Sequence, residues 1–145
     1  MKRILLIVLT ATAITACKPK QDATTVKNET MKIHDQVMAN HGKIIANQMK
    51  IDTLLKDMKA LKQQFSSIDT IQEKTNLKTM LNRLLKAEES MNDWMHHFNP
   101  DYNNTNMDSV IYYYKTEKQK INVIDSLYKR EIQESNQYLS KFKKS

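Results

Sequence analysis

Apolar residues recur along most of the chain at the spacing of a helix face. Between residues 31 and 65 they return every seven positions, and neighbours three and four positions away widen the line into a stripe. We therefore predict one long helix from about residue 26 to 65. The residues at the seven-residue interval are Val37, Ile44, Ile51, Met58 and Phe65.

Two further helical stripes follow, each after a polar segment. Residues 66–73 contain two successive helix-start patterns, Ser-Ser-Ile-Asp and Thr-Ile-Gln-Glu, and a second stripe covers residues 77–98. Residues 99–106 are rich in asparagine and include a proline, which indicates a turn before a third stripe at 110–142. The chain has one glycine, two prolines and no strand-like alternation. We predict an all-α fold, an antiparallel bundle of three long helices over residues 29–145.

The first residues have the pattern of an export signal. Residues 1–3 are a short basic head, and residues 4–14 are apolar apart from threonines, a stretch too short to span a bilayer. The sequence Ile-Thr-Ala-Cys that closes this segment resembles the bacterial lipobox, whose cysteine is lipidated and becomes the new N-terminus. We predict a lipoprotein signal peptide at 1–16, a lipid anchor on Cys17 and a flexible tether over 17–28.

Composition refines the expected location and partners. Cys17 is the only cysteine, so packing and not an intramolecular disulfide must hold the fold. Removing residues 1–16 leaves 21 basic against 16 acidic side chains, and the lysines are dispersed among the acids. Export and this dispersion argue against nucleic acid as the partner. We expect the membrane as one partner through Cys17, and an envelope protein or an acidic envelope polymer as another.

The neighbourhood of the anchor and the bundle architecture add two further expectations. Lys18 stands where some lipoproteins retained in the inner membrane carry aspartate, which favours the outer membrane, facing the periplasm. Long isolated bundles often pair along a remaining apolar stripe, so homo-oligomerisation stays open.

The histidines and several methionines converge in the predicted bundle. If the first two helices fold back near residue 67, the stretch 33–41 (IHDQVMANH) lies level with 91–98 (MNDWMHHF), and a second turn near residue 102 sets Met91 level with Tyr114. Imidazole and thioether groups suit copper, and imidazole also suits zinc. An alternative stays open, because methionine and histidine on a helix seam often serve only packing. The candidate copper or zinc ligands are His34, Met38, His41, Met91, Met95 and His97.

The sole glycine, Gly42, lies inside the predicted first helix, where it costs about 1 kcal/mol relative to alanine. We expect its small size to admit the close approach of Trp94 or of an aromatic residue on the third helix. A kink that shapes a binding site is the alternative.

Two stretches resemble a known group of proteins. The run from His34 to Met38 (HDQVM), followed by Gly42 and Ile44, and the later Trp-Met with Phe98, are similar to small lipoproteins of Bacteroidetes-type bacteria. These proteins often carry the label "viral A-type inclusion protein", and their function is unassigned. The chain departs from the family pattern at position 36, where the family has glutamate, and at position 41, where it has methionine. The resemblance implies a helical lipoprotein and no viral role.

Four Asp-Ser/Thr-aliphatic triplets look like the O-glycosylation acceptor of the same bacterial group. Helix capping accounts for some of these four triplets, because aspartate, serine and threonine gather at helix starts. Thr70 and Ser109 lie beside predicted turns, so they are the better acceptor candidates.

No signature of catalysis is present. The chain lacks a glycine-rich phosphate loop, a nucleophile elbow and a His-Glu-x-x-His motif, so we expect no enzymatic activity. The favoured function is a non-enzymatic, lipid-anchored envelope lipoprotein whose helical bundle is a structural or protein-interaction module. Its lysine-rich faces and the run Tyr112-Tyr113-Tyr114 are the contact candidates. The alternative is a periplasmic copper or zinc carrier or sensor that uses the histidine and methionine cluster.

Overall fold

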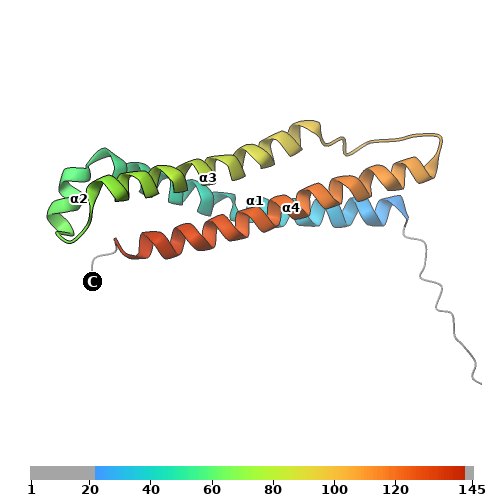
Figure 1. The fold of residues 1–145 in the computed structure, drawn as a ribbon. Helices are drawn as coiled ribbons and strands as arrows, with labels where there is room; N and C mark the ends of the chain where they lie inside the picture. Colours follow the sequence, from blue (N-terminus) through green and yellow to red (C-terminus); the bar gives the residue numbers. More distant parts are fainter. Residues whose placement is uncertain (1–21, 143–145) are drawn as a thin grey trace, which may run out of the picture.

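The computed structural model describes residues 22–142, and these residues form four helices and no strand. The helices are α1 (Ala23–Lys56), α2 (Met58–Gln64), α3 (Thr70–His97) and α4 (Met107–Ser140). The three long helices, α1, α3 and α4, lie side by side, and α2 forms part of the turn at one end (Figure 1). The predicted all-α class is confirmed. The predicted signal peptide and the predicted lipidation site, Cys17, lie outside the described residues.

Helix α1 begins earlier than predicted. Asp22 caps its N-terminus, because the Asp22 carboxylate accepts a hydrogen bond of 2.7 Å from the Thr25 amide. Val26 is fully buried and packs with Val110 and Tyr114 of α4. Placing the end of the tether at residue 28 was therefore wrong, since residues 23–28 belong to the bundle.

The predicted helix over residues 26–65 is divided in two at Asp57. The backbone of Asp57 is non-helical (φ −134°, ψ 71°), and its carboxylate accepts a hydrogen bond of 2.8 Å from the Ala60 amide. The side chain thus caps α2 at the point where α1 ends. Similar local caps start the other helices, with Asp69 bonded to two amides at the start of α3 and Asn106 bonded to the Asp108 amide at the start of α4.

Of the three long helices, α1 and α4 run in the same direction and α3 runs in the opposite direction. Contacts between α1 and α4 join residues at a nearly constant separation in sequence, from Thr30 with Tyr114 to Asn47 with Ser135, as expected for parallel helices. Helix α3 runs antiparallel to both. Gln48 of α1 donates to Glu88 of α3, a pair close to the register predicted for a turn near residue 67.

The register between α3 and α4 differs from the prediction. Phe98, at the end of α3, contacts Tyr114 of α4, with the ring centroids 6.4 Å apart, so Met91 does not lie level with Tyr114. The reason is the course of residues 98–106, which extend beyond the end of α3 before α4 begins (Figure 1). Helix α4 therefore starts farther out along the bundle axis than a tight turn would allow.

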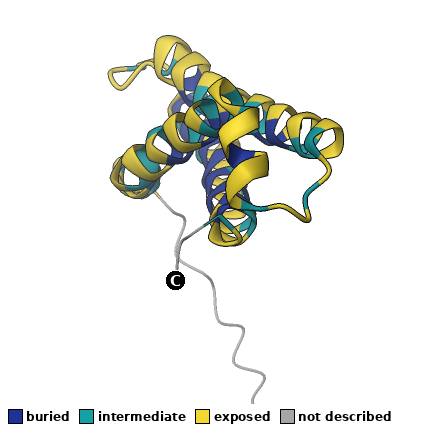
Figure 2. Cartoon of the chain, turned by 90° about the vertical axis from the view of Figure 1, so that its left-hand side faces the viewer, coloured by how far each residue is buried: buried dark blue, intermediate teal, exposed yellow. Residues whose placement is uncertain are grey.

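The core follows the predicted apolar stripes. The buried residues face the bundle axis along all three long helices (Figure 2). On α1 the line through Val37, Ile44 and Ile51 is fully buried. The largest wholly buried apolar side chains on the other two long helices are Leu77, Leu84, Met91, Ile121 and Tyr128.

Candidate functional site

A chain of aromatic rings connects the three long helices near the histidine stretch. The ring of His34 on α1 lies 5.8 Å from that of Trp94 on α3, and Trp94 stacks on Phe98 at 4.5 Å. Phe98 lies 6.4 Å from Tyr113 on α4, which stacks on Tyr102 at 4.2 Å. These contacts hold the segment between α3 and α4 against the bundle, and each ring pair contributes stability beyond that of the apolar area it buries.

The histidines on α1 occupy two separate environments. The Nδ1 atom of His34 lies 2.9 Å from the Asp35 carboxylate, and the ring packs on Trp94. The Nδ1 atom of His41 lies 3.3 Å from the Tyr128 hydroxyl, and the two rings stack with centroids 6.4 Å apart. Both histidine side chains are half-buried, and each contacts an aromatic side chain of another helix.

The other predicted ligands also differ in their surroundings. Met91 is fully buried in the core, whereas Met38 and Met95 are exposed. His97 is exposed, and its Nδ1 donates to the Asp93 carbonyl at 2.7 Å. Within residues 22–142, no three His, Cys, Asp or Glu side chains are placed to share one ion. Metal binding through histidine and methionine stays a prediction.

Gly42 does not serve the expected packing role. The residue is exposed, and apart from its chain neighbours and the adjacent backbone of α1, a Cβ atom added there would meet no described atom within 4 Å. The expectation that an aromatic ring approaches Gly42 closely was wrong, because Trp94 lies on the side of α1 that carries His34.

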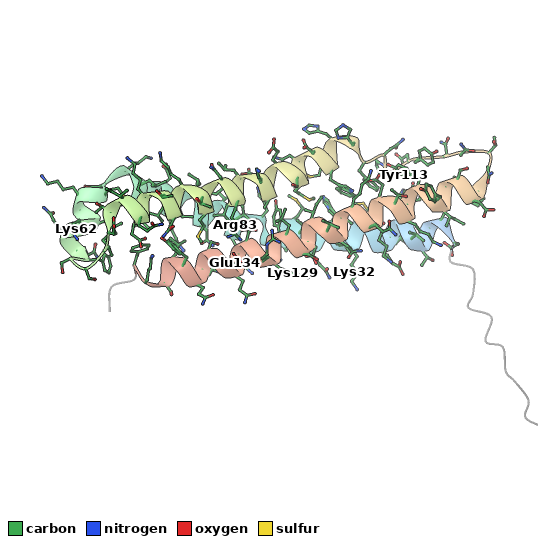
Figure 3. All side chains as sticks on the ribbon, viewed as in Figure 1. Lys32, Lys62, Arg83, Tyr113, Lys129 and Glu134 are labelled. Carbon is green, nitrogen blue, oxygen red and sulfur yellow. The ribbon has the colours of Figure 1, made fainter. Side chains whose placement is uncertain are left out.

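The three consecutive tyrosines of α4 have three different roles. Tyr114 is buried, and its hydroxyl donates to the Pro100 carbonyl at 2.9 Å. The Tyr113 hydroxyl accepts a hydrogen bond of 2.7 Å from the Asn99 amide. Burial raises the pKa of both phenols. Tyr112 is 74% exposed, so it alone of the run is a contact candidate (Figure 3 marks the position of Tyr113).

Sequence reasoning missed a buried polar layer between α1 and α4. The Asn47 amide donates to the Ser135 hydroxyl at 2.8 Å and to the Asn136 side chain at 2.9 Å. The signal was present, because Asn47 continues the apolar stripe three positions after Ile44. A buried polar pair of this kind fixes the register of two helices, since any sliding leaves both groups unsatisfied.

The proposed glycosylation acceptors lie where the sequence placed them, beside turns. Thr70 is the first residue of α3 and Ser109 lies in the first turn of α4, and both are half-buried. The related Thr53 and Ser126 are more exposed, but they lie within helices and their hydroxyls donate to backbone carbonyls one turn earlier. Glycosylation at Thr70 and Ser109 stays a prediction.

Tyr128 predicts a loss of stability at alkaline pH. Burial, with a smaller contribution from the charge of Glu88, raises the pKa of Tyr128 from 10.0 to about 12. The folded state therefore holds this proton more tightly than the unfolded state. The protonated Tyr128 hydroxyl makes its full contribution to stability below pH 10. Between pH 10 and 12 we expect the free energy of unfolding to fall by about 2–3 kcal/mol.

Urea denaturation across this pH range measures the loss. In a Tyr128→Phe variant, the free energy of unfolding should fall less between pH 10 and 12, because the titrating hydroxyl is absent. A Tyr112→Phe variant, changed at the exposed position, should lose as much as the wild type. An equally steep decline in the Tyr128→Phe variant would show that other groups cause it.

The fold defines the class of the protein as an elongated, all-α three-helix bundle. No helix within residues 22–142 is both long enough and apolar enough to cross a membrane. Comparison with protein-family models, with curated proteins and with solved structures found no match.

Proposed function

We propose that the protein is a non-enzymatic, lipid-anchored lipoprotein of the cell envelope, and that its helical bundle is a structural or interaction module. The observation that carries the proposal is the export signal that ends in Ile-Thr-Ala-Cys, with the cysteine at position 17. A diacylated or triacylated cysteine gives stable membrane attachment, which a single acyl chain does not.

The short connection between anchor and bundle supports this proposal. Only residues 18–22 separate Cys17 from Ala23, the first residue of α1. A chain of this length reaches at most about 20 Å even when fully extended. The end of the bundle at which α1 begins is thus kept near the lipid surface. We place this surface at the outer membrane, facing the periplasm, because Lys18 is not the retaining aspartate.

The non-enzymatic part of the proposal is supported by how the buried charged groups are used. Glu131 is bonded to Arg83 and Arg130, and Glu117 to Lys120. These are ion pairs between or along helices, and not a nucleophile oriented by a base. The alternative, a copper or zinc carrier, has weaker support because His34 and His41 are engaged in packing contacts.

The proposal is tested by replacing the anchor. The full chain is expressed in a Gram-negative host, and we expect the wild type in the membrane fraction, with an intact mass that lacks residues 1–16 and includes the acyl groups. A Cys17→Ser variant should leave the membrane fraction, because the thioether cannot form. A Lys18→Ser variant, which keeps the thiol, should remain membrane-bound.

The wild-type result could also contradict the proposal. A wild-type protein recovered as a soluble species with an unmodified Cys17 thiol would refute lipid anchoring. The same mass spectrum reports any sugar added at Thr70 or Ser109.

A further inference from the structure

The positive charge of the described chain is concentrated at one end of the bundle. We call this the distal end, comprising residues 50–78 and 137–142, and it lies opposite the start of α1 (Figure 1). It holds seven lysines against four acidic residues, whereas the rest of residues 22–142 holds ten basic against twelve acidic residues. In Figure 3, Lys62 lies at the distal end and Tyr113 lies toward the opposite end.

The acidic residues of the distal end are all engaged locally. Asp57 and Asp69 cap helices, and each accepts hydrogen bonds from backbone amides. Asp52 is paired with Lys56 at 2.6 Å, and Glu73 with Lys141 at 2.8 Å. Each of these four carboxylates therefore already has a hydrogen-bond or ion-pair partner within the bundle.

Five distal lysines have no acidic partner among the described residues, and the ammonium group of one of them, Lys62, donates to the backbone carbonyls of Ser66 and Ile68. The other four lysines have neither kind of partner. Lys50, Lys59, Lys74 and Lys78 are exposed, and none of them forms an ion pair with another of the residues between 22 and 142. We call these four residues the distal lysine cap. Two more lysines, at 143 and 144, follow in the sequence outside the described residues.

We propose that the distal lysine cap binds an anionic, carboxylate-bearing polymer of the cell envelope, as peptidoglycan is, while the opposite end is held at the membrane. This inference rests on the proposed function, because lipid anchoring fixes which end faces the membrane. The 34 residues of α1 alone separate the two ends by about 50 Å. The bundle then acts as a spacer between a lipid surface and a polymer layer.

The charge distribution favours a polymer over the anchoring membrane as the occupant of the cap. If the bundle lay flat on an anionic bilayer, its remaining described length, with ten basic against twelve acidic residues, would also approach the lipid without gaining any net attraction. A repeating carboxylate polymer can instead engage several cap lysines together. Each single contact is weak in water, and their combination supplies the affinity.

Co-sedimentation with purified peptidoglycan sacculi tests the inference. The mature lipidated chain, extracted from membranes in a neutral detergent, is mixed with sacculi at increasing salt. A variant with all four cap lysines replaced by glutamine should bind at least about tenfold more weakly. Wild-type binding should also decrease as the salt concentration rises from about 0.05 to about 0.3 M.

The matched control removes the same charge elsewhere. Four exposed lysines outside the distal end, each replaced by glutamine, give the same net charge and should change binding less than about twofold. Circular dichroism confirms that both variants are folded. The control lysines are Lys32, Lys43, Lys86 and Lys115.

Two outcomes would overturn the inference. An equal loss in both quadruple variants would mean that net charge and not the cap decides binding. Wild-type protein that binds phosphatidylglycerol vesicles but not sacculi would identify a lipid surface as the partner. The full-length Cys17→Ser chain should still bind sacculi. If lipid anchoring is wrong, only the membrane fractionation differs from expectation. If the distal lysine cap does not bind the polymer, only the binding to sacculi differs.

Discussion

A Leu84→Ala variant should lose about 3 kcal/mol of the free energy of unfolding. Leu84 lies on α3 and is fully buried in the core shared by the three long helices. Truncation removes apolar area from the core and leaves a cavity that a rigid bundle fills only in part. Urea denaturation, monitored by circular dichroism at neutral pH, measures the difference.

The adjacent residue supplies a matched control. Leu85 has the same side chain on the same helix, but it is 45% exposed, so Leu85→Ala should cost less than about 1 kcal/mol. Equal losses at the two positions would mean that α3 is not packed through Leu84. A larger loss at Leu85 would indicate that this surface is covered by a second copy of the chain.

Hydrophobic periodicity was sufficient to predict the helices and most of the core. The seven-residue line on α1 corresponds to buried residues because a helix face returns to the same direction after two turns. The break at Asp57 was not predicted, since the apolar line continues through Met58, the first residue of α2, to Phe65, which follows its last residue. A single aspartate side chain that bonds to a nearby amide is enough to end a helix there, and periodicity does not detect it.

The candidate site was predicted less well because it depends on register. The sequence brought the 33–41 stretch close to 91–98, and the contact of His34 with Trp94 confirms this proximity. It did not predict that residues 98–106 extend past α3, because asparagine and proline indicate a turn without giving its length or direction. That extension carries Phe98 to Tyr113 and Tyr114, and it moves Met91 away from them.

Interhelical polar pairs show the same limit. The residues of the Asn47 layer are separated by 88 positions in the sequence, so only the final alignment of α1 with α4 shows that they meet. Likewise, the cap lysines have no ion-pair partner because the nearby acidic residues cap helices or pair with other lysines. Composition gave the excess of lysine, but its concentration at one end emerges from the folded arrangement.

The second large effect is expected at Arg83, which joins α3 to α4. Its guanidinium lies 2.7 Å from the carboxylate of Glu131 and is also hydrogen-bonded to Glu134. These hydrogen bonds raise the pKa of Arg83, so the group stays charged. Glu131 is only 2% exposed, so its charge depends on its partners. An Arg83→Met variant leaves this carboxylate with Arg130 alone and should lose about 2–3 kcal/mol of the free energy of unfolding.

The loss should be smaller than for a wholly unpaired buried charge, because Arg130 remains 2.9 Å from Glu131 and the Arg83 side chain is partly exposed. Lys86→Met on the same helix is the matched control. Lys86 is exposed and forms no ion pair with another described residue, so its replacement should change stability by less than about 0.5 kcal/mol.

A double-mutant cycle separates the ion pair from the loss of the arginine stem. In the Arg83→Met/Glu131→Gln variant the buried charge at position 131 is also removed, so the double variant should recover at least about 1 kcal/mol relative to the sum of the two single losses. Simple additivity would show that the pair contributes nothing to the packing of α3 on α4. Coupling would instead mean that the pair specifies their register, because a shift by one turn separates Arg83 from Glu131 and leaves the carboxylate buried with fewer donors.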